Sequence, residues 1–154
     1  MQRRSFLRGI GIAAAASAVV TPTMVMAEAP KGANVLGYDA AVNAITGGKK
    51  ATVSSKVHMK APEIAENGAV VPVTVTVDSP MTDADYVKAI HVLASKNGNV
   101  RCADVMLTPA NGAAMFAARI KLGTSQDVVA IVETSTGEFL SASQNVKVTI
   151  GGCG

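Results

Sequence analysis

Aromatic side chains are scarce in this sequence of 154 residues, which has no tryptophan, three phenylalanines and two tyrosines. Binding sites for sugars, nucleobases and flat cofactors usually stack the ligand on such rings. The aromatics after residue 27 are dispersed along the chain and form no cluster: Tyr38, Tyr86, Phe116 and Phe139. The scarcity argues against a site that stacks its ligand on aromatic rings.

A long apolar run is also missing. The longest one, residues 9–20, is well short of the roughly 20 residues that a helix needs to cross a bilayer. Arginines precede this run and the small-residue site Val25-Met26-Ala27 follows it, which is typical of a cleaved export signal. We predict a signal peptide over residues 1–27 and no membrane anchor, with a retained anchor as the less favoured interpretation.

The type of leader is indicated by its first residues. Arg3 and Arg4 are followed by Ser5-Phe6-Leu7, which resembles the twin-arginine signal of bacteria. That pathway exports folded proteins, so we expect the mature protein to fold before export and to work in the periplasm.

Net charge is also low once the predicted signal is set aside. Three of the 14 Lys and Arg residues lie in the predicted signal, whereas all 11 Asp and Glu residues follow it. The remaining chain therefore has 11 positive against 11 negative side chains and no basic run. This balance argues against nucleic acid or an anionic membrane as a partner.

The mature part is long enough for one domain, which we place at residues 28–150. Tyr38, Ala41, Val42 and Ile45 have helical spacing before the breaker Gly47-Gly48, which predicts one short helix. After it, apolar residues alternate with polar ones, as in half-buried strands. The expected strands lie around residues 53–59, 71–77, 89–93, 100–107, 115–122, 128–134, 139–143 and 146–150.

Turn signals separate these strands. Asn97-Gly98-Asn99 predicts a hairpin and Thr136-Gly137 another tight turn. Pro72 cannot donate a ladder hydrogen bond, so its position should be an edge or a strand start. Seven or eight short strands at this spacing predict an all-β fold, an antiparallel sandwich of two sheets.

Cysteine is rare as well, with Cys102 and Cys153 alone. Cys102 lies in a predicted strand and is expected to be a core or half-buried thiol. Cys153 is expected on a stretch that packs against nothing, since Gly151, Gly152 and Gly154 flank it. A bridge between the two cysteines is possible in an oxidising compartment, but a glycine tether is a poor site for a structural disulfide. Cys153 is therefore the candidate reactive group.

Metal and hydrolase sites are not predicted. A copper site would need a histidine, and usually a methionine, soon after the cysteine, but only Gly154 follows. His58 and His91 lie on separate predicted strands without a ligand at suitable spacing, so we expect them to face solvent or an interface. A cysteine hydrolase also needs a base held beside its thiol, which a glycine tether cannot position. We expect no catalytic residue, no metal and no cofactor.

Several blocks carry a resemblance to a known family. They are the twin-arginine leader, Ala61 to Ala69 (APEIAENGA), Val77 to Met81 (VDSPM), Leu107-Thr108-Pro109, and Lys147 to Gly154 (KVTIGGCG). Together these blocks resemble the SoxY family, carrier subunits of the bacterial Sox system for thiosulfate oxidation. The family tail has two glycines on each side of its cysteine, whereas one glycine follows Cys153 here.

The resemblance implies a fold, a function and partners. The fold would be an immunoglobulin-like sandwich that pairs with a SoxZ-like subunit in a heterodimer or a larger assembly. Residues 151–154 would form a swinging arm, with Cys153 as the attachment point of sulfur and its glycines providing flexibility. A haem-containing Sox cytochrome would join thiosulfate to Cys153 as an S-thiosulfonate, a hydrolase would release sulfate and leave a persulfide, and other partners would oxidise the remaining sulfur.

Two other functions stay open. The chain could be a periplasmic interaction or assembly module that dimerises through a disulfide at Cys153. It could also be a redox enzyme that uses Cys102 together with Cys153.

Overall fold

The computed structural model describes residues 35–153, which form two packed β-sheets and one helix. The predicted signal with Arg3 and Arg4, and the terminal Gly154, lie outside the described residues. The elements in chain order are α1 (Tyr38–Thr46), β1 (Thr52–Val53), β2 (Val57–Lys60), β3 (Ile64–Asn67), β4 (Val71–Val77), β5 (Val87–Ala94), β6 (Arg101–Met106), the 3-10 turn η2 (Pro109–Asn111), β7 (Ala114–Ile120), β8 (Gln126–Thr134) and β9 (Phe139–Ile150).

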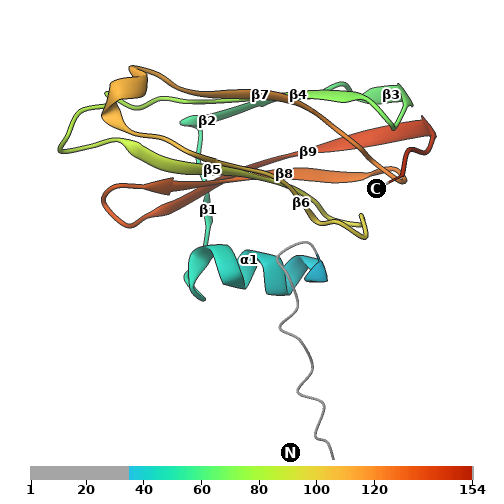
Figure 1. The fold of residues 1–154 in the computed structure, drawn as a ribbon, viewed down its shortest axis with the longest axis horizontal. Coiled ribbons are helices and arrows are strands. Elements are labelled where there is room, and N and C mark those ends of the chain that lie inside the picture. Colours follow the sequence, from blue (N-terminus) through green and yellow to red (C-terminus); the bar gives the residue numbers. More distant parts are fainter. Residues whose placement is uncertain (1–34, 154) are drawn as a thin grey trace, which may run out of the picture.

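The larger sheet has the strand order β1-β9-β8-β5-β6, and β3 also pairs with β9. The smaller sheet has the order β2-β4-β7. All pairs are antiparallel except β1 with β9 and β3 with β9, which are parallel. The two sheets lie face to face in Figure 1, so the predicted all-β, immunoglobulin-like sandwich with a short helix is confirmed.

The core lies between the sheets and follows from strand alternation. In β4, the odd-numbered valines from Val71 to Val77 are buried while the residues between them are exposed or half-buried. Strands β5 and β8 contribute Ile90, Val92 and Val132, which are also buried. Burying a valine or isoleucine side chain stabilises a fold by about 1.5–3 kcal/mol. This aliphatic core holds together without a single tryptophan.

The helix α1 covers the outer face of the larger sheet, away from the smaller sheet (Figure 1). Ala41 packs there in a second cluster with Leu93 and Ile131. Gly47, with φ of 62°, ends the helix in the left-handed conformation that glycine adopts easily. A hollow of about 510 Å³ remains between helix and sheet, and Tyr38 is the one aromatic residue that lines it.

Several details differ from the sequence prediction. The expected strands at 139–143 and 146–150 are one continuous strand, β9, because Ser143 and Gln144 stay paired with β8 through Val129 and Val128. The sequence prediction contains no strand at the position of β3. Pro72 is the second residue of β4, and β2 pairs only with Thr74 to Val77 of that strand. Pro72 therefore lies at a strand start, as predicted.

No helix within residues 35–153 has the length and apolar character needed to cross a membrane.

Candidate functional site

The candidate site lies where β9 ends and the chain continues to Cys153. Ile150 is the last residue of β9, and Gly151, Gly152 and Cys153 follow without regular structure. The C-terminus lies at the same end of the sandwich as β3 (Figure 1). Cys153 is exposed and free, as expected for a thiol that reacts with external molecules.

The tail is held to the sandwich by backbone hydrogen bonds. The Gly152 N–H donates to the Leu122 carbonyl at 2.9 Å, and the Gly68 N–H donates to the Ile150 carbonyl at 2.7 Å. The Leu122 N–H donates in turn to the Gly68 carbonyl at 2.7 Å. Three segments that are distant in sequence, around residues 68, 122 and 151, therefore meet at one junction. We call this junction, formed by residues 68–69 and 122–123, the tail cradle.

Glycine is required in the cradle for space. A Cβ added at Gly151 or Gly152 would lie less than 3.0 Å from the backbone of Gly123 or Ala69. Such a distance essentially never occurs for real Cβ atoms. The expectation of a tail that packs against nothing is therefore wrong for Gly151 and Gly152, because only residues without side chains let two backbones approach this closely.

A hollow of about 220 Å³ opens beside the tail. Its lining comes from the β5–β6 turn, from β6, from the end of β7 and from the tail itself. The lining residues are Asn97, Asn99, Cys102, Arg119, Ile120, Lys121 and Cys153. The hollow is thus polar and cationic, and it contains both cysteines.

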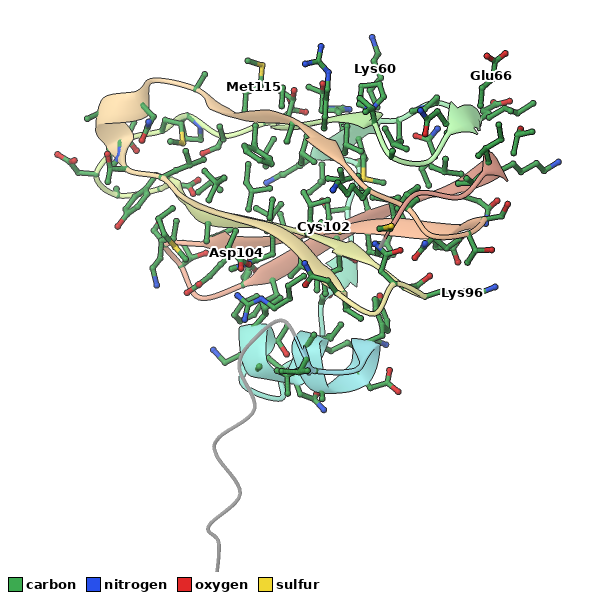
Figure 2. The ribbon with its side chains drawn as sticks, turned by 45° about the vertical axis from the view of Figure 1, so that its right-hand side comes forward. Lys60, Glu66, Lys96, Cys102, Asp104 and Met115 are labelled. Atoms are coloured by element: carbon green, nitrogen blue, oxygen red, sulfur yellow. The ribbon has the colours of Figure 1, made fainter. Side chains whose placement is uncertain are left out.

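Cys102 is half-buried on β6 and free, as the sequence predicted. Figure 2 labels it between the two layers of the sandwich. Burial raises the pKa of the Cys102 thiol from 9.0 to about 11. Cys102 is therefore almost entirely protonated at neutral pH.

The histidines lie away from the tail. His58 on β2 is exposed and bonds Asp78 at 2.8 Å, as expected for a solvent-facing residue. His91 on β5 is buried and bonds Asp104 at 2.5 Å, so the expectation that it faces solvent or an interface is wrong. The partner Asp104 lies opposite His91 on the paired strand β6, across the hairpin that Asn97-Gly98-Asn99 predicts. Within residues 35–153, no group of three or more His, Cys, Asp or Glu side chains could hold a metal ion.

The candidate thiol and its flanking glycines could be predicted from the sequence, but the tail cradle could not. Gly68 and Ala69 belong to the block Ala61 to Ala69 that carries the family resemblance, whereas no sequence pattern marks Leu122 and Gly123 as site residues. Both pairs reach the tail through contacts across more than twenty residues of sequence, which local periodicity does not predict. The sequence leaves a bridge between Cys102 and Cys153 open, and the structure shows two free thiols in one hollow.

Comparisons with known proteins agree with the fold and the tail. The family model described as sulfur oxidation protein SoxY matches residues 42–153, which include β9, Gly151, Gly152 and Cys153. The structure of the sulfur carrier protein SoxY from Chlorobium limicola f thiosulfatophilum is 31% identical, with a TM-score of 0.62, and the match covers 73% of this chain and 96% of that chain. No curated protein matches the sequence.

Superoxide reductases share the fold alone. The enzyme from Ignicoccus hospitalis (neelaredoxin) is 21% identical, with a TM-score of 0.55 and coverage of 60% of this chain and 80% of that chain. The enzyme from Nanoarchaeum equitans is 8% identical, with a TM-score of 0.52 and coverage of 62% and 99%. At these identities the likeness carries no function. The family model and the Chlorobium structure do identify the family, and the chain belongs to the SoxY family of sulfur oxidation proteins.

Proposed function

We propose that the protein is a sulfur carrier of the Sox system and holds intermediates of thiosulfate oxidation covalently on Cys153. The observation that carries the proposal is an exposed thiol at the end of a glycine tail, in a chain of the SoxY family. Neither histidine of the chain lines the hollow beside Cys153, so the surroundings of the thiol offer no imidazole base. The protein presents the sulfur, and the catalysts are other proteins.

The chemistry begins with oxidative loading. The Cys153 thiol and the outer sulfur of thiosulfate form an S–S bond, which releases one proton and two electrons to a haem-containing cytochrome partner. A hydrolase then adds water across the bond to the sulfonate group, which releases sulfate and leaves a persulfide on Cys153. Further partners oxidise that remaining sulfur, and the thiol returns to its starting state.

The proposal also covers the reach of the tail, the partner subunit and the cellular location of the protein. The four residues 151–154 span about 13 Å when extended, at about 3.3 Å per residue, so the tail could enter a partner's cleft once it leaves the cradle. Residues 28–150 act as the carrier domain, bound to a SoxZ-like subunit, and residues 1–27 direct export through the twin-arginine pathway to the periplasm.

The test is thiosulfate-dependent electron transfer in a reconstituted Sox system, with Cys153→Ser compared with the matched control Cys102→Ser. We expect Cys153→Ser to abolish turnover, because the attachment atom is lost, and Cys102→Ser to retain it. Mass spectrometry of the C-terminal peptide, from protein purified without reductant, should show sulfur adducts on Cys153.

Two outcomes would contradict the proposal. Full turnover by Cys153→Ser would place the sulfur elsewhere. A C-terminal peptide found only as a disulfide-linked pair of chains would favour the assembly module instead.

A further inference from the structure

The two thiols of the chain share one hollow, although carriage of sulfur requires only one of them. Cys102 lies on the rigid strand β6, and Cys153 lies on the tail. They are free in the structure, and the hollow between the surrounding segments has a volume of about 220 Å³. A second thiol beside an oxidised sulfur adduct is a potential reaction partner for that adduct.

A β-bulge directs Cys102 into the hollow. The pairing of β5 with β6 passes from Val92–Ala103 to Leu93–Arg101, which leaves Cys102 as the extra residue. Regular alternation would place Cys102 on the same face of the sheet as Asp104, which bonds His91. Instead Cys102 packs, like Ala103, against the core between the sheets. Bulges commonly redirect a side chain near functional sites in this way.

The tail cradle keeps Cys153 at the same place. The hydrogen bond from the Gly152 N–H to the Leu122 carbonyl fixes the residue immediately before Cys153. Lys121, which precedes Leu122, lines the hollow together with Cys153. In the docked tail, the carried group therefore lies in the same hollow that Cys102 lines.

The charges around the hollow suit an anionic leaving group. Besides the two thiols, its titratable lining groups are Arg119 on β7 and Lys121 just after β7, while Asn97 and Asn99 are neutral. Within the described residues, no carboxylate lines the hollow. Two cations near the reacting sulfurs stabilise negative charge that develops on a departing group.

We propose that Cys102 discharges the S-thiosulfonate from Cys153 when a loaded tail stays docked. This inference rests on the proposed carrier function. The Cys102 sulfur, after losing its proton to solvent, attacks the Cys153 Sγ, and the bond from Sγ to the sulfane sulfur breaks. The products are a Cys102–Cys153 disulfide and one thiosulfate dianion. No external oxidant is needed, because the adduct already carries the two oxidising equivalents.

Burial of the Cys102 thiol limits the rate of this discharge. The raised pKa of Cys102, about 11, leaves a small thiolate fraction at neutral pH. Attack by Cys102 is therefore slower than transfer of the sulfur to a partner enzyme. It releases thiosulfate only from a loaded protein whose tail stays docked and meets no partner. The rate should rise about tenfold per pH unit below the pKa, in proportion to the thiolate.

The experiment uses reduced protein without any partner enzyme. Sodium tetrathionate loads Cys153, the excess reagent is removed, and peptide mapping confirms the adduct at that position. Intact mass and a thiosulfate assay then follow the decay with time. We expect wild-type protein to release one thiosulfate for each monomeric disulfide formed, with a first-order rate that does not depend on protein concentration.

Cys102→Ser should retain the adduct at least tenfold longer, and Cys102→Ala serves as a second variant without an oxygen in the core. Circular dichroism of both variants is the control for folding. Equal decay in wild type and both variants, or decay that gives only dimers, would overturn the inference. Because no partner takes part, these results are independent of the turnover of Cys153→Ser, which tests the carrier function itself.

Discussion

At the scale of single residues, the two cysteines differ in environment more than in chemistry. Cys153 is exposed at the end of a backbone that is anchored one residue earlier, whereas Cys102 is half-buried at a bulge in β6. Burial disfavours a thiolate because the charge loses its hydration. The same side chain is thus exposed to solvent at one position and kept protonated by burial at the other.

The buried thiol makes stability depend on pH. Cys102 has a pKa of about 11 in the fold against 9.0 for an ordinary thiol, so the unfolded chain binds fewer protons between these values. Its contribution is complete below pH 9.0 and is lost as the pH rises toward 11. Urea unfolding of Cys153→Ser should therefore show a falling free energy of unfolding across this window. The double variant Cys102→Ala/Cys153→Ser should lose part of that slope, and identical slopes would contradict the assigned pKa.

At the scale of elements, the tail belongs to the sandwich while it is docked. Strand β3 pairs with β9 in parallel, and the segments after β3 and after β7 form the cradle that receives Gly151 and Gly152. The carrier tail thus has a defined resting place, and the proposed function requires it to leave. Glycine suits both the docked and the released tail. It fits the cradle because it has no side chain, and its backbone rotates freely outside the cradle.

Replacing Gly152 by a residue with a side chain tests the docking of the tail and its use by partner enzymes in a protein that still folds. Gly152→Val cannot fit against Ala69, so the tail should detach with the loss of one backbone hydrogen bond, about 1 kcal/mol. We expect a small change in the unfolding midpoint. We also expect slower turnover with every partner enzyme, since the valine side chain would hinder entry of the tail into a narrow partner cleft. Thiosulfate-dependent turnover and urea titration measure the two effects. Thr149→Val, at an exposed position of β9, is the control, and turnover of Gly152→Val equal to wild type would refute the prediction.

At the scale of the whole molecule, the fold separates carriage from support. The core between the sheets is aliphatic and complete without Cys153, and α1 covers the opposite face of the larger sheet (Figure 1). The tail site lies at one end of the sandwich, where Gly151 and Gly152 are docked in the cradle. Under the proposed function, the tail would leave this end of the sandwich while the core between the sheets stays unchanged.

Export should depend on the two leader arginines. Replacing both Arg3 and Arg4 by lysine keeps the charge of the leader but removes the guanidinium pair typical of twin-arginine signals. We expect the protein to remain in the cytoplasm with its leader uncleaved, as judged by cell fractionation and immunoblotting. Arg8→Lys is the control and should be exported normally. Normal export of the double variant would exclude the twin-arginine route.

Much of the fold could be predicted because its signals are local. Alternating valines specify β4, and the helical spacing before Gly47 specifies α1. The predictions were wrong or silent where pairing decides the outcome: Gln144 continues β9 because β8 pairs with it throughout, and β3 exists because β9 offers a free edge.

By itself, the sequence determined the sandwich, the single exposed thiol and the family, since strand alternation, terminal position and motif blocks can all be read along the chain. Only the tertiary structure decided that Gly151 and Gly152 are docked and that Cys102 faces the hollow of Cys153. The physical reason is that the close approach of distant backbones and the register of a bulge are properties of paired strands. No single segment carries that information.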